Sequence, residues 1–158
     1  MRETAISLKK NELVYDVEYA LHKLSRVERD SEGRPSDALL SESDHDHLDR
    51  LFESALSNVK SELSWCVVHG HHPFVSDGLA GSPGDYDLVL RMDVGWRGDM
   101  QSLCSAVHDY FVHYAVYHHL LTVSPLLAPS YAALTESDLN KAYSIARGNL
   151  DIGRASLF

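Results

Sequence analysis

The segment that leads to Leu121 constrains the fold most, because its pattern is that of a long helix with apolar residues on nearly every side. One stripe, with a spacing of three to four residues, consists of Leu103, Ala106, Val107, Tyr110, Tyr114, Tyr117 and Leu121. Most of the remaining circumference carries Phe111, Val112, Ala115, Val116 and Leu120. A helix that is apolar on so many sides lies either at the centre of its domain or between its domain and another subunit.

An alternating segment just before this helix predicts a half-buried β-strand. One face carries Tyr86, Leu88, Leu90, Met92 and Val94, and the other carries Asp87, Arg91 and Asp93. A Gly-Trp-Arg-Gly turn over residues 95–98 separates the strand from the helix. Phe74-Val75 is the candidate for a partner strand, so residues 69–95 are expected to form a hairpin or loop region.

Three more segments have helical periodicity. The first begins near Lys10, and its apolar stripe is Leu13, Val14, Val17, Ala20, Leu21 and Leu24. The second can be capped by Ser41, Ser43 or Asp44 and is expected to reach Val68, with the stripe Leu48, Leu51, Phe52, Ala55, Leu56, Val59, Leu63 and Cys66. The last has Pro129 in its first turn and is expected to reach Ser156, with the apolar face Tyr131, Leu134, Ala142, Ile145, Ala146, Leu150 and Leu157.

These elements predict a mainly α fold. We expect a single four-helix domain over residues 1–158, with a small β-hairpin inserted between the second and third long helices. The chain has 158 residues, 44% of them hydrophobic, which suffices for one core. Residues 1–8 form either a short strand or an extended arm, and the polar residues 28–42 form a surface loop because they contain Gly33 and Pro35.

Charge and cysteine content argue against several classes of protein. The 14 Lys and Arg residues against 23 Asp and Glu residues give a net charge of −9, whereas a surface that grips a nucleic acid backbone needs clustered Lys and Arg. Cys66 and Cys104 lie in apolar helical patterns, which favours buried free thiols and a reducing compartment. Since the first thirty residues lack a signal-peptide pattern and no apolar run reaches the ~20 residues that span a bilayer, we expect a protein made in the cytoplasm without membrane contact.

The ten histidines are the obvious candidates for metal chemistry, but their spacing argues against it. His108, His113 and His118 recur every five residues, so they turn around the helix and do not line one side of it. No His-Glu-x-x-His motif occurs, and no cysteine pair has zinc-finger spacing. We therefore assign no metal ligand, although the sequence leaves open whether a metal binds a cluster at a predicted helix end, His69, His71 and His72.

Motifs for nucleophilic catalysis and phosphate binding are also lacking. The apolar setting of Cys66 is expected to raise the pKa of its thiol and make it inert. The glycine-rich residues 78–84 precede a strand, whereas a phosphate cradle opens a helix, so we expect a turn there. We assign no catalytic and no cofactor-binding residue, and we expect neither enzyme activity nor a cofactor.

The aromatic series Tyr110, Phe111, Tyr114 and Tyr117 fits a core. Tyrosines also suit interfaces, because they bury a large area and keep a polar tip. Three other helices and a hairpin are not expected to cover all the apolar surface of the central helix. The surplus surface would serve contacts between subunits, so we expect a homo-oligomer.

The order of the elements resembles a known family. Its pieces are a helix over residues 11–24, the second helix with Leu48-Asp49-Arg50-Leu51-Phe52, the strand Tyr86–Met92 leading to Trp96, and the helix Val112–Leu121 with a closing helix that ends Ala155-Ser156-Leu157-Phe158. In this order and in its hydrophobic pattern, most of the chain resembles the small head–tail connector proteins (neck or adaptor rings) of tailed phages and prophages, especially the Bacteroidetes-phage type. The glycine-rich residues 78–84 and the histidine-rich residues 65–72 depart from the pattern of that family.

The resemblance implies a structural virion protein that forms a homo-oligomeric ring of about a dozen copies in the phage neck. Its partners would be further copies of itself together with portal and tail or neck proteins, and DNA would pass through the ring without specific binding. An acidic lumen would repel the passing DNA, which gives the net charge a role. Residues 1–8 and 28–37 are the candidates for contacts with adjoining virion proteins.

Two other classes stay open. The histidine count favours a metal-dependent helical-bundle enzyme of the DinB-like type, with three histidines from separate helices, but paired histidines at i and i+4 and a general base beside them are missing. A cytoplasmic regulator or antitoxin-like binding module would need a partner surface that the sequence does not locate.

Overall fold

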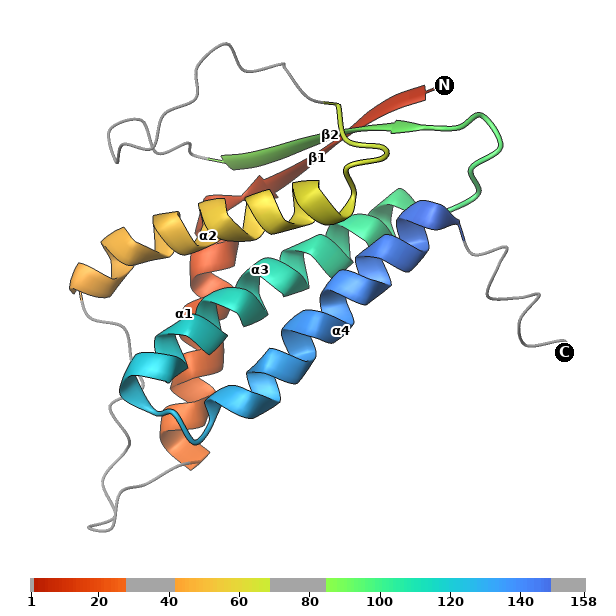
Figure 1. The fold of residues 1–158 in the computed structure, drawn as a ribbon. Helices are drawn as coiled ribbons and strands as arrows, with labels where there is room; N and C mark the ends of the chain where they lie inside the picture. The colour runs from red at the N-terminus through yellow and green to blue at the C-terminus, as the bar shows by residue number, and fades with distance from the viewer. Residues whose placement is uncertain (1, 28–41, 69–84, 149–158) are drawn as a thin grey trace, which may run out of the picture.

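The structure is a computed structural model that describes residues 2–27, 42–68 and 85–148. In chain order its elements are β1 (Arg2–Lys9), α1 (Lys10–Val27), α2 (Glu42–Glu62), β2 (Asp85–Met92), α3 (Met100–Val123) and α4 (Ala128–Arg147), as Figure 1 shows. The predicted class is confirmed: the fold is mainly α, with four long helices and a β-strand between α2 and α3.

The partner of the strand between α2 and α3 is the beginning of the chain. β1 and β2 pair antiparallel over their whole length, from Arg2 opposite Met92 to Lys9 opposite Asp85. Of the two forms expected for the first residues, the structure therefore has the strand. The suggested partner, Phe74-Val75, lies outside the described residues.

The alternation of the second strand is confirmed up to Met92, because its even-numbered residues from Tyr86 are buried. The assignment of Val94 to the buried face is wrong, since this side chain is 87% exposed. The strand ends at Met92 and the chain turns, with the Trp96 N–H donating to the Asp93 carbonyl (3.0 Å). The two-residue alternation places side chains on opposite faces only within a strand, so it does not predict the burial of residues beyond the strand end.

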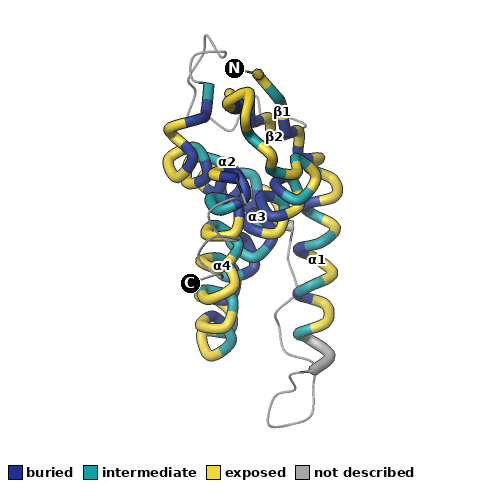
Figure 2. Tube along the Cα trace, turned by 90° about the vertical axis from the view of Figure 1, so that its right-hand side faces the viewer, coloured by how far each residue is buried: buried dark blue, intermediate teal, exposed yellow. Residues whose placement is uncertain are grey.

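α3 lies at the centre of the domain, and it contacts α1, α2, α4 and β1. Figure 2 shows its tube largely buried between the surrounding elements. Asp99 caps its first turn, because its carboxylate accepts from the backbone N–H groups of Gln101 (3.1 Å) and Ser102 (3.2 Å). Its buried residues are Leu103, Ala106, Val107, Tyr110, Phe111, Val112, Ala115, Val116, His119 and Leu120.

Two helix ends differ from the prediction. α2 ends at Glu62 and not at Val68, because the chain turns at Leu63 and then pairs with β2, where the Arg91 N–H donates to the Cys66 carbonyl (2.7 Å). α4 has Pro129 in its first turn as expected, but it ends at Arg147, and Gly148 follows with φ of +91°. The remainder of the predicted final helix, residues 149–158, lies outside the described residues.

An aromatic cluster joins three elements of the core. The rings of Phe52 on α2, Tyr86 on β2 and Phe111 on α3 contact one another with centroid distances of 5.8 to 6.2 Å. Aromatic pairs at these distances stabilise a fold beyond the area that they bury. The cluster therefore holds the small sheet and α2 against the central helix.

Candidate functional site

Three histidines form bridges between different pairs of helices. His108 on α3 contacts Asp16 on α1 (Nε2–Oδ2, 2.6 Å), and His113 on α3 contacts Asp138 on α4 (Nδ1–Oδ2, 2.5 Å). A third bridge joins His45 on α2 to Glu18 on α1 (Nε2–Oε1, 3.1 Å). The five-residue spacing on α3 thus places its histidines against different neighbours, as the sequence indicated. Each bridge links two helices, and the three bridges form no common centre.

The remaining described histidines of α3 are packed among other side chains. The His118 ring lies 4.3 Å from the Tyr114 ring and 5.1 Å from the Tyr117 ring, and burial together with nearby His47 lowers the pKa of His118. The following residue, His119, is buried. Among residues 2–27, 42–68 and 85–148, no three His, Cys, Asp or Glu side chains are placed to hold one metal ion. The cluster His69, His71 and His72 lies outside these ranges.

Both cysteines are free thiols, as predicted. Burial raises the pKa of the Cys66 thiol to about 11, and its S–H donates to the Leu63 carbonyl (3.4 Å). Cys104 is half-buried, and burial followed by the charge of Glu12 raises its pKa as well. A thiol that stays protonated at neutral pH is a poor nucleophile, so neither cysteine is set up for catalysis.

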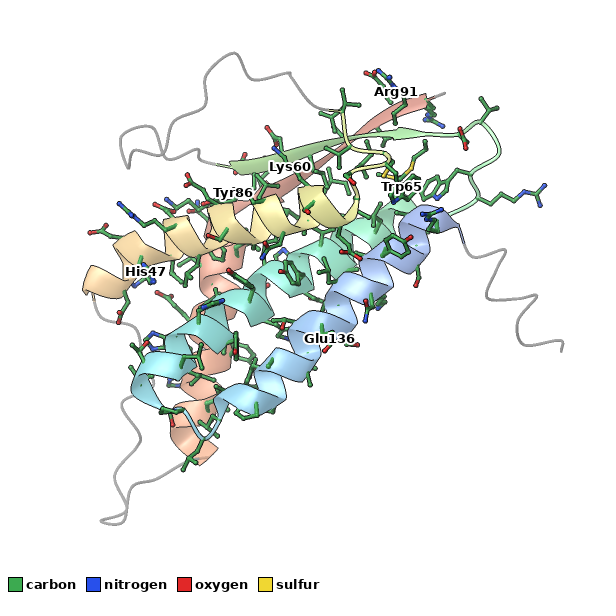
Figure 3. The ribbon with its side chains drawn as sticks, in the orientation of Figure 1. His47, Lys60, Trp65, Tyr86, Arg91 and Glu136 are labelled. Atoms are coloured by element: carbon green, nitrogen blue, oxygen red, sulfur yellow. The ribbon has the colours of Figure 1, made fainter. Side chains whose placement is uncertain are left out.

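Contacts of an arginine and of aromatic rings join the C-terminal end of α4 to the turn after α2 and the turn after β2. The Arg147 guanidinium lies 4.9 Å from the Trp65 ring and 5.2 Å from the Tyr143 ring. Trp65 is labelled in Figure 3, in the turn after α2. The Trp96 Nε1–H donates to the Ile145 carbonyl (3.1 Å), and a Cβ on Gly98 would come within 2.2 Å of the Trp96 ring. Gly98 is therefore required for the close approach of this ring.

The outer face of α1 carries aromatic side chains that the core does not cover. Tyr15 is 66% exposed, its ring stacks on Tyr19 (centroids 6.3 Å apart), and the Lys23 ammonium lies 4.8 Å from the Tyr19 ring. Beside Tyr15, a groove of about 490 Å³ runs between α1 and α2, lined by Lys10, Asn11, Val14, Tyr15, Glu18, His45, Asp46 and Asp49. Stacked exposed tyrosines beside a groove are typical of a contact surface for another protein.

A second apolar surface lies at the turn between α3 and α4. Leu126 in this turn is 95% exposed. Other large exposed side chains flank it at the end of α3 and in the first two turns of α4, namely Leu121, Val123 and Leu134. The exposure of Leu134 contradicts its assignment to the buried face of the last helix. The first half of α4 packs on α3 through other residues, because the Tyr131 ring lies 5.9 Å from the His113 ring and Asp138 bridges to the same histidine, whereas Leu134 stays 42% exposed.

Comparisons of this chain with protein-family models, with curated proteins and with solved structures find no match. None of the described helices combines the length and the apolar character that a bilayer crossing requires. The candidate functional site is therefore defined by surface chemistry: the tyrosine face of α1 with its groove, and the apolar turn between α3 and α4.

Proposed function

We propose that this chain is a structural protein that assembles with copies of itself, as a head–tail connector ring of a tailed phage or prophage. The observation that carries the proposal is the pair of separate contact surfaces, the tyrosine face of α1 and the apolar α3–α4 turn. Fully burying one leucine such as Leu126 stabilises an assembly by about 1.5–3 kcal/mol. An exposed leucine in the turn, with further exposed apolar side chains in the two helices beside it, thus favours a covering partner.

Two different surfaces on one chain favour a ring. When one patch contacts a different patch on the next copy, the contact is heterologous and repeats around a closed circle. Figure 2 shows α1 and α4 on opposite sides of α3, so the tyrosine face and α4 border different sides of the molecule. In the proposed ring, portal and tail proteins adjoin the two faces, and DNA passes an acidic lumen without specific binding.

The test measures native mass by light scattering or native mass spectrometry, with metal content determined on the same sample. We expect a metal-free closed ring of about a dozen copies when the portal protein is present. Leu126→Glu is expected to prevent ring formation, because it places a charge in the contact. Val94→Glu is the matched control, since Val94 is also highly exposed, at 87% against 95% for Leu126, but lies in the turn after β2.

Other results would overturn the proposal. A metal-loaded monomer or dimer would favour the metal-dependent helical-bundle enzyme. A metal-free protein that forms no ring, even with a portal protein, would remove the connector function. Rings that form unchanged with Leu126→Glu would show that the α3–α4 turn is not a contact surface.

A further inference from the structure

Within the described residues, the small sheet has one covered edge and one open edge. Residues 66–68 run along the outer side of β2, where Val67 bridges Leu90 and the Val68 N–H donates to the Val89 carbonyl (2.9 Å). In the described part of the chain, no strand pairs with the outer edge of β1. The outer edge of an eight-residue strand presents a row of backbone N–H and C=O groups, which is a template for a further strand.

The side chains in the second half of β1 alternate between a buried and an exposed face. Ile6 and Leu8 point to the core and are buried, whereas Glu3, Ala5, Ser7 and Lys9 are exposed on the other face. The two charges of that face already have partners across the sheet. Glu3 accepts from Arg91 (2.8 Å), and Lys9 donates to Asp85 (2.8 Å). Arg91 is labelled in Figure 3, where it points away from the helices.

We propose that the open edge of β1 pairs with β1 of a second copy, antiparallel and about a two-fold axis, with Ile6 opposite Ile6. The result is a four-stranded antiparallel sheet with the order β2, β1, β1, β2. In this register Glu3 lies opposite Lys9 of the second copy, and the symmetry repeats the pair. Residues directly opposite each other in an antiparallel pair share a face, so the apolar row and the charged row both continue across the axis.

Other registers fail on charge or on face. Pairing all eight residues would place Arg2 opposite Lys9, which are like charges, and would place exposed Glu3 opposite buried Leu8. A shift by two residues keeps the faces but leaves Glu3 opposite Ser7 or Lys9 opposite Ala5. Only the register centred on Ile6 pairs opposite charges, and a one-residue slip reverses every face.

The proposed sheet carries alternating charges along its exposed face. Two symmetry-related rows of charges run across the four strands. Each row consists of Arg91 and Glu3 of one copy followed by Lys9 and Asp85 of the second copy, so every charge has an opposite charge beside it. Within one chain, the two existing ion pairs form the halves of these rows. The charges on the edge are therefore complementary to the same edge of another copy, and the occupant is a second copy of this chain.

This dimer goes beyond the proposed ring and does not depend on it. A two-fold contact is closed and makes a dimer only, whereas a ring that joins a head to a tail has two different faces and no two-fold axis relating them. The β1 dimer is a form of the free protein. It involves neither the tyrosine face nor the α3–α4 turn, so each proposal can fail while the other stands.

The test uses two charge-swapped variants of the full chain at low ionic strength. Variant one carries Glu3→Lys with Arg91→Glu, and variant two carries Lys9→Glu with Asp85→Lys. Each keeps an ion pair within the chain but places like charges opposite each other in both rows of its homodimer. We expect each homodimer to be about 10- to 100-fold weaker than that of the wild type, because two cross-strand contacts, one in each row, change from attraction to repulsion.

Mixing the two variants restores opposite charges in both rows, so we expect a one-to-one heterodimer of nearly wild-type affinity in native mass spectrometry. The control variant carries Glu53→Lys with Lys60→Glu on α2, which exchanges two charges away from the sheet and keeps the net charge. Circular dichroism checks that all variants are folded. Amide exchange of β1 should slow in the dimer. A wild-type chain without a dimer, homodimers of unchanged affinity, or no heterodimer on mixing would overturn the proposal.

Discussion

α1 and α4 both pack against α3, but they do so with side chains of different size. α4 runs alongside α3, whereas α1 crosses it (Figure 1). The buried residues of α4 are small, with three alanines and one isoleucine. The buried residues of α1 are Leu13, Val17 and Leu21.

The difference shows two ways in which one central helix can be covered. Small residues let two helix backbones approach closely. The contact then extends along the helices, and its stability is the sum of many small van der Waals contributions. Large branched residues fill a wider space at a crossing, so each one carries a larger share of the contact. The α1 flank should therefore be sensitive to lost volume, and the α4 flank to added volume.

Leu21→Ala should give the largest effect. Leu21 is fully buried, and removing a buried leucine leaves a cavity that costs about 2–5 kcal/mol of unfolding free energy. Urea unfolding followed by circular dichroism measures the loss, with Leu134→Ala on the exposed part of α4 as the control. Equal losses for the two variants would contradict the contrast between the flanks.

Ala142→Leu tests the opposite sensitivity on α4. Ala142 is fully buried, and added methylene groups in a packed contact typically cost about 1–3 kcal/mol. Ala133→Leu on the same helix is the matched control, because Ala133 is exposed and leucine is a good helix former. If Ala142→Leu unfolds at the wild-type urea concentration, the α3–α4 contact is not close-packed.

The two histidine–aspartate bridges give the smallest expected difference. Asp138 on the α4 side is 14% exposed, whereas Asp16 on the α1 side is 45% exposed. We expect Asp138→Asn to lower the unfolding free energy by about 1 kcal/mol, because a charged hydrogen bond becomes a neutral one, and Asp16→Asn to lower it by less than about 0.5 kcal/mol. Thermal melts of both variants in one buffer compare them. A larger loss for Asp16→Asn would reverse the ranking.

Periodicity predicted the elements well where one face is buried throughout. The stripes of α1 and α2 and the alternation of β2 up to Met92 were read correctly, since the core selects apolar residues at the period of each element. The errors lie at ends. The turn at Leu63 continues the apolar spacing of α2 after the helix has stopped, and Val94 continues the alternation of β2 after the strand has stopped.

The contact surfaces were harder to foresee. Tyr15 and Tyr19 lie four residues apart and off the apolar stripe of α1, which was the available signal for an exposed aromatic face. Leu134 was assigned to a buried face, because periodicity does not reveal how much of a helix's circumference its neighbour covers. The assembly that these surfaces serve stays a prediction.

The sequence by itself determined the class of the fold and its four helices, because a buried face leaves a periodic pattern in each helix. Only the tertiary structure decided that the most apolar helix lies at the centre of its domain, where it contacts α1, α2, α4 and β1. Only the tertiary structure decided that β2 pairs with β1, at a separation of 76 residues between Lys9 and Asp85. Strand pairing depends on which edges meet in space, and a period of two is the same for every partner. The open edge of β1 follows from that choice.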